Sequence, residues 1–91
     1  MKVYNGIQYK EYSVLGAKDY SALARIKVNP YVVSVFCRLL KEKNRETIVA
    51  ASSLENGEIR FDVIDISYAK NACDKVSKLT DIKYEFMKIE D

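Results

Sequence analysis

Apolar and polar residues alternate most regularly on either side of Asn56-Gly57. This pair favours a tight turn because both residues tolerate a positive φ, so we predict a β-hairpin within residues 46–66. A two-residue turn places Arg60 and Asp62 on the polar face of that hairpin. The opposite, apolar face contains Ile48, Ala50, Leu54, Ile59, Phe61 and Val63.

The register of this hairpin determines which face Asp65 occupies near the end of the second strand. The two-residue turn sets Ser52 opposite Phe61 and would leave Asp65 on the buried face. A carboxylate is disfavoured there, so we expect a β-bulge near Val63 that turns Ile66 inward instead.

Residues 30–43 are predicted to form the first long helix. Asn29 can accept hydrogen bonds from the first amides, and Pro30 loses none at the first helical position. Several valines would also suit a strand, but the basic end of the segment favours a helix because cations stabilise a helix C-terminus. Asn44 is expected to end it in a left-handed conformation.

A second helix is expected after Ser67, which can cap its first turn. Its apolar positions have the spacing of one helical face. They are Ala69, Ala72, Cys73, Val76 and Leu79. Thr80-Asp81 ends this helix, and alternation predicts a last strand over residues 82–89.

The N-terminal third is less decisive. Asn5-Gly6 forms either the turn of a small hairpin or a loop tip that leads into one strand over residues 7–15. Residues 17–28 carry both a helical and an alternating pattern, and we favour a short helix. These elements give an α+β fold, a single domain over residues 1–91 with helices on one face of an antiparallel sheet. Their βαββαβ order is typical of ferredoxin-like sandwiches.

Composition supports a globular protein in a reducing compartment. Hydrophobic residues make up 48% of the 91 residues, with only three Gly and one Pro. No apolar run approaches the length of a membrane span, and the N-terminal segment lacks the apolar core of a secretory signal. Cys37 and Cys73 fall on apolar helix positions, so we expect two buried free thiols and a cytoplasmic location.

The residues exclude most catalytic chemistries. The chain has no His, no phosphate-binding glycine loop and no nucleophile motif. Cys37 could act as a nucleophile beside Arg38, but a buried, inert thiol is the more common role of a free cysteine. The acidic residues of the hairpin are spread along a strand, which suits a solvated face better than a metal site. We therefore predict no catalytic site, metal or cofactor.

Charge and tyrosine content point to a binding protein. Residues 18–45 contain seven cations against two carboxylates, and residues 46–66 contain five carboxylates against one cation. We predict a non-enzymatic protein that binds a macromolecule, most readily another protein, such as a phage- or mobile-element-encoded inhibitor or modulator of a host protein. The predicted partner-binding residues are Tyr9, Tyr12, Tyr20, Arg38, Lys41, Lys43 and Arg45.

The alternative is nucleic-acid binding through the basic end of the helix at residues 30–43. An exposed part of the valine face at Val32, Val33 and Val35 would favour a homodimer.

Overall fold

Six antiparallel strands form one sheet in the computed structural model, which describes residues 1–13 and 20–89. The strand order is β1-β2-β3-β5-β4. On one edge of β3, β2 pairs with its first residues and β6 pairs with its last residues. The strands are β1 (Lys2–Tyr4), β2 (Ile7–Ser13), β3 (Tyr20–Val28), β4 (Ile48–Ser53), β5 (Glu58–Val63) and β6 (Tyr84–Phe86). The helices are α1 (Val33–Lys43) and α2 (Ala69–Thr80). A tight turn with a positive φ at Asn56 spans Glu55–Gly57, and a single 3₁₀ turn spans Ile66–Tyr68.

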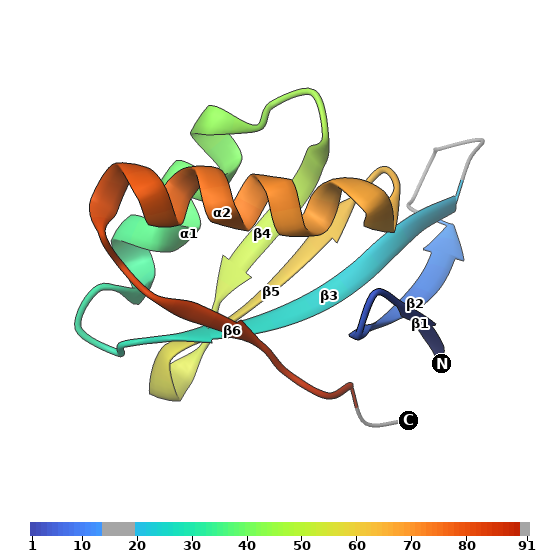
Figure 1. The fold of residues 1–91 in the computed structure, drawn as a ribbon, viewed down its shortest axis with the longest axis horizontal. Helices are drawn as coiled ribbons and strands as arrows, with labels where there is room; N and C mark the ends of the chain where they lie inside the picture. Colours follow the sequence, from blue (N-terminus) through green and yellow to red (C-terminus); the bar gives the residue numbers. More distant parts are fainter. Residues whose placement is uncertain (14–19, 90–91) are drawn as a thin grey trace.

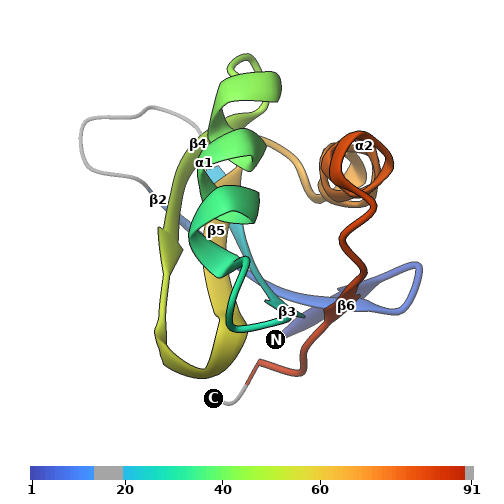
Figure 2. The ribbon, with the colours of Figure 1, turned by 90° about the vertical axis from the view of Figure 1, so that its left-hand side faces the viewer.

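Both helices cover the same face of the sheet (Figures 1 and 2). They bury Phe36 and Leu40 of α1 and Val76 of α2 against Ile26 of β3 and Phe61 of β5. The α+β class and the placement of the helices on one face are therefore confirmed.

The central strand β3 corrects the predicted helix over residues 17–28; residues 17–19 of that prediction lie outside the described part of the chain. Ala22, Ala24, Ile26 and Val28 are all buried, which is the period-two pattern of a strand. β3 pairs with β5 on one side and with β2 and β6 on the other, so sheet pairing overrides the helix propensity of its alanines.

The N-terminal hairpin reading is confirmed. Asn5 and Gly6 have φ values of 49° and 81°, as a tight turn between β1 and β2 requires. The strand after this turn, β2, is observed over Ile7–Ser13, and the two last residues of its predicted range lie outside the described residues.

The hairpin between β4 and β5 is confirmed, but its predicted register is wrong by one residue. Its loop has three residues, Glu55–Gly57, closed by a 2.7 Å hydrogen bond from the Leu54 N–H to the Glu58 carbonyl. Ala51, not Ser52, therefore lies opposite Phe61. The one-residue shift turns the other side chains of β4 toward the core.

The irregularity in this hairpin lies on β4, between Ile48 and Ala50, and not at the predicted position near Val63. Ile48 and Ala51 consequently face the core, whereas Leu54 is 40% exposed. Ile66 is buried, as predicted.

The helix boundaries differ from prediction at their N-terminal ends. Asn29 accepts a hydrogen bond from the Tyr31 N–H, but a turn follows it and α1 begins at Val33. The predicted left-handed end at Asn44 is wrong: its φ is −134°, and its buried side chain donates to the Leu40 carbonyl at 2.9 Å.

The second helix begins after a capped turn. Asp65 accepts a hydrogen bond from the Ser67 N–H at 2.9 Å, so Asp65 takes the capping role predicted for Ser67. The apolar face of α2 is buried as predicted except at Leu79, which is 61% exposed. Asp81 has a φ of 60°, which ends the helix at the predicted place.

The elements from β3 to β6 occur in the order βαββαβ. The first strand of this series is β3, whereas the sequence pattern predicted the strand that begins at residue 7. Within this part the strands lie in the order β6-β3-β5-β4, so each helix links two strands that have another strand between them. The hairpin of β1 and β2 extends the sheet beside the first residues of β3, on the same edge that β6 occupies beside its last residues.

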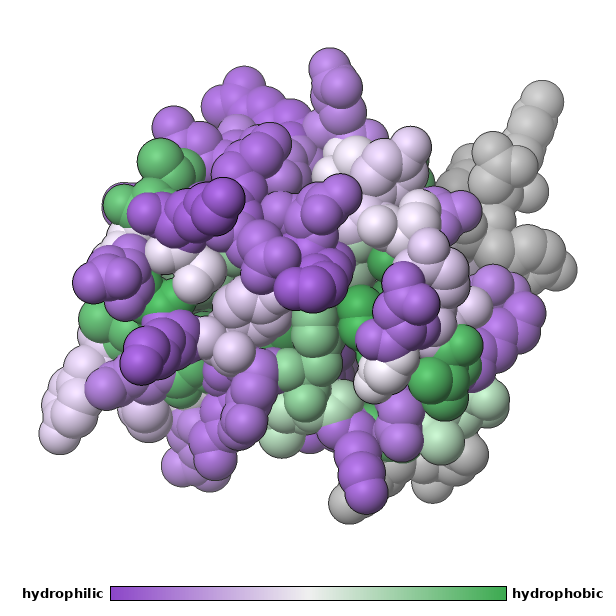
Figure 3. All heavy atoms as spheres, in the orientation of Figure 1, coloured by the Kyte–Doolittle hydropathy of each residue, from purple (hydrophilic) through white to green (hydrophobic). Residues whose placement is uncertain are grey.

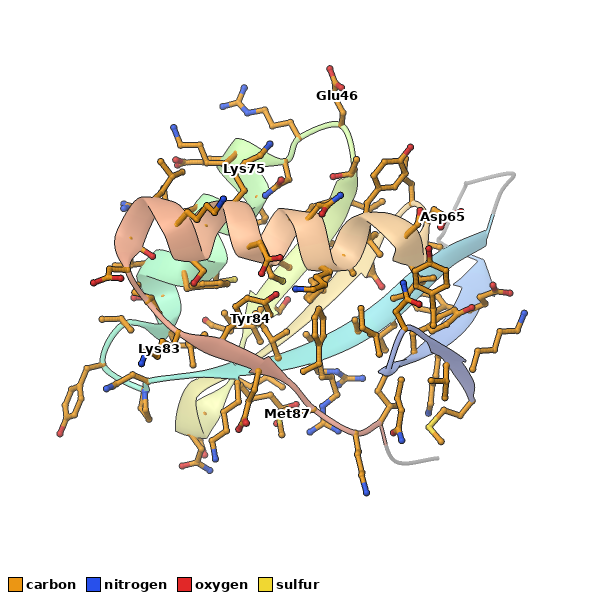
Figure 4. All side chains as sticks on the ribbon, viewed as in Figure 1. Glu46, Asp65, Lys75, Lys83, Tyr84 and Met87 are labelled. Atoms are coloured by element: carbon orange, nitrogen blue, oxygen red, sulfur yellow. The ribbon has the colours of Figure 1, made fainter. Side chains whose placement is uncertain are left out.

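A hydrogen bond between Tyr84 and Asp74 joins β6 to α2 at 2.6 Å (Figure 4). We expect Tyr84→Phe to lower the free energy of unfolding at pH 7 by about 1 kcal/mol, because Asp74 is partly solvated and a bond to a carboxylate contributes modestly there. The bond lowers the pKa of Asp74, so the loss should shrink as the pH falls below about 3.9. Urea unfolding at pH 7 and pH 3 measures both values, and an equal loss at the two pH values would contradict this role.

Candidate functional site

The face of the sheet opposite the helices carries the clearest candidate site. Alternation along β3 and β5 places Leu23, Arg25, Arg60 and Asp62 on this open face, because their neighbours in each strand are buried in the core. In the register, Arg60 lies beside Ser52 of β4, and Asp62 lies beside Ala50. Both neighbours on β4 are small; Arg60 is exposed, and Asp62 is half-buried.

A groove of about 430 Å³ lies on this open face. Its apolar part is formed by Leu23 and by Leu54, which is 40% exposed, and its charged part by Arg60 and Asp62. The lining residues are Tyr12, Leu23, Ala50, Ala51, Ser52, Leu54, Arg60 and Asp62. Such a mixture of apolar walls and a few polar groups is typical of binding sites.

Asp62 is the most unusual group in the groove. Its Oδ1 atom is buried and has no hydrogen-bond partner within residues 1–13 and 20–89. Burial raises the pKa of this carboxyl above its usual value. A buried oxygen without a donor is unfavourable, so an N–H or a cation bound at the exposed part of this half-buried carboxyl would stabilise its charge.

Arg60 complements Asp62 with a cation two residues earlier on the same face. Its guanidinium makes no hydrogen bond or ion pair with the described residues, so it is available to an acceptor on a partner. Arg25, the next cation across the face, is instead engaged with Glu58 at 2.5 Å. The hydrogen bond from Arg25 is the main cause of the lowered pKa of Glu58, and the nearby charge of Arg60 contributes less. Arg60 therefore interacts with Glu58 only through its charge, whereas Arg25 is held by direct contact.

Asp62→Asn is expected to stabilise the free protein. At pH 7 the substitution removes a carboxylate whose raised pKa shows that folding disfavours its charge, so stability should rise by up to about 1 kcal/mol. The gain should disappear near pH 3, where Asp62 is protonated in both states.

The matched control is Asp65→Asn. The Ser67 backbone N–H lowers the pKa of Asp65, so its charge contributes stability above about pH 3.9 and the variant should be less stable at pH 7. Thermal unfolding at pH 7 and pH 3 distinguishes the two. A loss of stability at pH 7 in Asp62→Asn would show that the carboxylate is satisfied in the folded protein.

The structure separates the tyrosines predicted to bind a partner. Tyr12 lines the groove, whereas Tyr9 has only 9% of its surface exposed and belongs to the core. The backbone of Tyr20 begins β3, but its side chain lies outside the described residues. Of the predicted tyrosines whose side chains are described, Tyr12 alone lines this groove.

The predicted basic residues lie elsewhere, along the second half of α1 and just after its C-terminal end. Arg38, Lys41, Lys43 and Arg45 are exposed, and α2 brings Lys75 beside them, with its Nζ atom 3.2 Å from the Lys43 carbonyl (Figure 4). Carboxylates interrupt this basic end, because Glu42 and Glu46 line the same depression of about 340 Å³ as Lys43, Arg45 and Lys75. The side of the molecule formed by α2 is largely hydrophilic (Figure 3).

Neither thiol is placed for nucleophilic chemistry. Cys37 and Cys73 are free and buried, and burial raises the pKa of both, so each is mainly a neutral thiol near pH 7. Within the described ranges, no three or more acidic or cysteine side chains converge as metal ligands.

The groove residues Leu23, Leu54, Arg60 and Asp62 were missed as a site by the sequence interpretation. The sequence did place Arg60 and Asp62 together on the polar face of the hairpin, which could have pointed to this site. The predicted two-residue turn, however, placed Ala50 and Leu54 on the opposite face, so the groove that they line with Arg60 and Asp62 was not predicted. No family model, curated protein or solved structure matches this chain. In the described part of the chain, no helix is both long and apolar enough to cross a membrane.

Proposed function

We propose that this chain acts by binding another protein through the open-face groove of its sheet. The observation that carries the proposal is the buried Oδ1 atom of Asp62, which lacks a hydrogen-bond partner among the described residues. It lies in one groove with Arg60, which makes no hydrogen bond or ion pair within the same residues, and with the exposed side chain of Leu54. Binding would supply a donor to Asp62 and remove apolar surface from water. Both changes favour the complex.

The proposed role is non-enzymatic and belongs to a reducing compartment such as the cytoplasm, in keeping with two free, buried thiols. A small protein that binds without catalysis fits the inhibitors or modulators that phages and mobile elements direct at host proteins. In this proposal Tyr12 anchors the partner, and the cations of α1 assist the encounter without forming the site.

Affinity capture from native host lysate tests the proposal when it is made with surface variants. We expect one protein to be captured, in an amount that nuclease treatment does not change. Tyr12→Ala or Asp62→Arg should reduce that amount at least tenfold. The control variant Lys78→Glu changes an exposed charge on α2 and should leave capture unchanged. If the groove variants fold normally and capture the same protein at wild-type levels, the groove is not the site.

The competing function is nucleic-acid binding at the basic end of α1. The position of Lys75 beside Lys43 favours it, because two helices then contribute cations to one surface. Retention on DNA or heparin should in that case fall steeply between low and moderate salt and be lost in Lys41→Glu/Lys43→Glu. Absence of DNA and RNA binding at low salt would remove this candidate.

A further inference from the structure

Strand β4 forms an edge of the sheet with no charged residue to protect it. Its sequence IVAASS contains neither a charge nor Pro, whereas each of the other five described strands carries at least one charged residue. Edge strands usually carry such residues because their unpaired backbone groups recruit other strands. The irregularity between Ile48 and Ala50 affects one end only and leaves Ala50–Ser53 as a regular edge.

The register identifies the backbone groups at this edge. The Leu54 N–H donates to the Glu58 carbonyl, which makes that pair a hydrogen-bonded one. Hydrogen-bonded and non-hydrogen-bonded pairs alternate in an antiparallel ladder, so Ser52 also bonds to β5. The N–H and C=O groups of Ala51 and Ser53 therefore point away from β5, toward the position of an additional strand.

An added strand would bring its side chains close to the charges of the groove. Residues of that strand opposite Ala50 and Ser52 would share the open face with Asp62 and Arg60. Two strand spacings, about 10 Å, separate them from the β5 backbone, a gap that a long side chain and its charged partner span together. Ala50 and Ser52 are too small to block the approach.

We propose that the β4 edge binds an extended segment of a partner protein in which an acidic residue precedes a basic residue by two positions. The segment adds antiparallel to β4, with its central residue paired to Ala51. Its acidic side chain then lies opposite Ser52 and meets Arg60, and its basic side chain lies opposite Ala50 and meets Asp62. This inference rests on the proposed function and specifies the partner chemistry of the same groove.

A second copy of this chain fits the edge less well. In an antiparallel β4–β4 pair centred on Ala51, Ala50 would face Ser52 of the other copy, and neither supplies a charge. Arg60 of one copy and Asp62 of the other would then be three strand spacings apart, about 14 Å. The charge pattern of the groove therefore favours a segment with its own Glu and Lys.

Two capped synthetic peptides of equal composition test the inference. The first is Thr-Val-Glu-Val-Lys-Val-Thr, and the second exchanges its Glu and Lys. We expect the first to bind about tenfold more tightly in titrations of the ¹⁵N-labelled protein, and its binding to shift the amide signals of Ala51 and Ser53. The double variant Arg60→Glu/Asp62→Lys should reverse the preference.

A third peptide distinguishes strand addition from charge attraction alone. It is the first peptide with a methyl group on the backbone nitrogen of the central Val, which removes the hydrogen bond to the Ala51 carbonyl and keeps both charges. We expect its binding to be lost. Equal binding of the methylated and unmethylated peptides would overturn strand addition, and equal binding of the two charge orders would overturn the proposed pattern.

The free protein must also be monomeric in sedimentation for this assignment to hold, since a dimer that protects Ala51 and Ser53 would make a second copy the occupant. Failure of the peptides, together with partner capture that still depends on Tyr12 and Asp62, would overturn this inference alone. Loss of dependence on both residues would overturn the proposed function as well.

Discussion

Gly57→Ala is expected to lower the free energy of unfolding by more than about 3 kcal/mol, or the melting temperature by more than about 12 °C. Gly57 has a φ of 81°, a conformation that disfavours any residue with a Cβ atom. A Cβ at this position would lie 2.0 Å from the Val28 carbonyl oxygen, so the hairpin loop and the end of β3 would have to separate.

Gly6→Ala is the matched control for this prediction. Gly6 has the same φ of 81°, but a Cβ there would have no atom within 4 Å. Its loss should be about 1–2 kcal/mol, the conformational part alone. Urea unfolding of both variants measures the difference, and equal losses would show that the contact of Gly57 with Val28 is not needed.

Leu40→Ala is expected to lower the free energy of unfolding by about 2–5 kcal/mol. Leu40 is fully buried between α1 and the sheet, so truncation removes apolar contacts and leaves a cavity in the core. Leu79→Ala makes the same chemical change on a helix, at a side chain that is 61% exposed, and should change stability by less than about 0.5 kcal/mol.

The comparison of these two leucines also tests the packing of α2. The apolar spacing of the sequence includes Leu79 in the buried face of that helix, whereas the structure places it in solvent. Chemical denaturation followed by circular dichroism is sufficient for both variants. A loss above about 1.5 kcal/mol at Leu79 would mean that this side chain is covered in solution.

Local signals predicted much of the fold correctly. The α+β class, the two helices and the hairpins at Asn5-Gly6 and Asn56-Gly57 follow from short-range properties: helical periodicity and the tolerance of Asn and Gly for positive φ. The helix predicted over residues 17–28 failed because its alanines suit a helix in isolation. Their burial in β3 depends on strands on both sides, which no short window contains.

The candidate site depended on a register that the turn residues did not specify. Asn56 and Gly57 adopt the positive φ values of the predicted tight turn, and the Glu58 N–H donates to the Glu55 carbonyl. The Glu58 carbonyl, however, accepts from the Leu54 N–H, so Glu55 is an extra residue on the β4 side, and Gly57 lies against Val28, far away in the sequence. This tertiary contact accompanies the one-residue shift that brings Ala50 beside Asp62 on the open face. Arg60 and Asp62 were correctly placed on the polar side, yet the groove beside them required the long-range contact.

We expect a partner protein to bind along β4 and the open-face groove. Amide hydrogen exchange of this chain, with and without the partner obtained by affinity capture, measures this binding. Exchange at Ala51 and Ser53 should be slower in the complex, and exchange at Lys41 and Lys43 should be unchanged. Protection confined to the end of α1, with β4 exchanging as in the free protein, would contradict it.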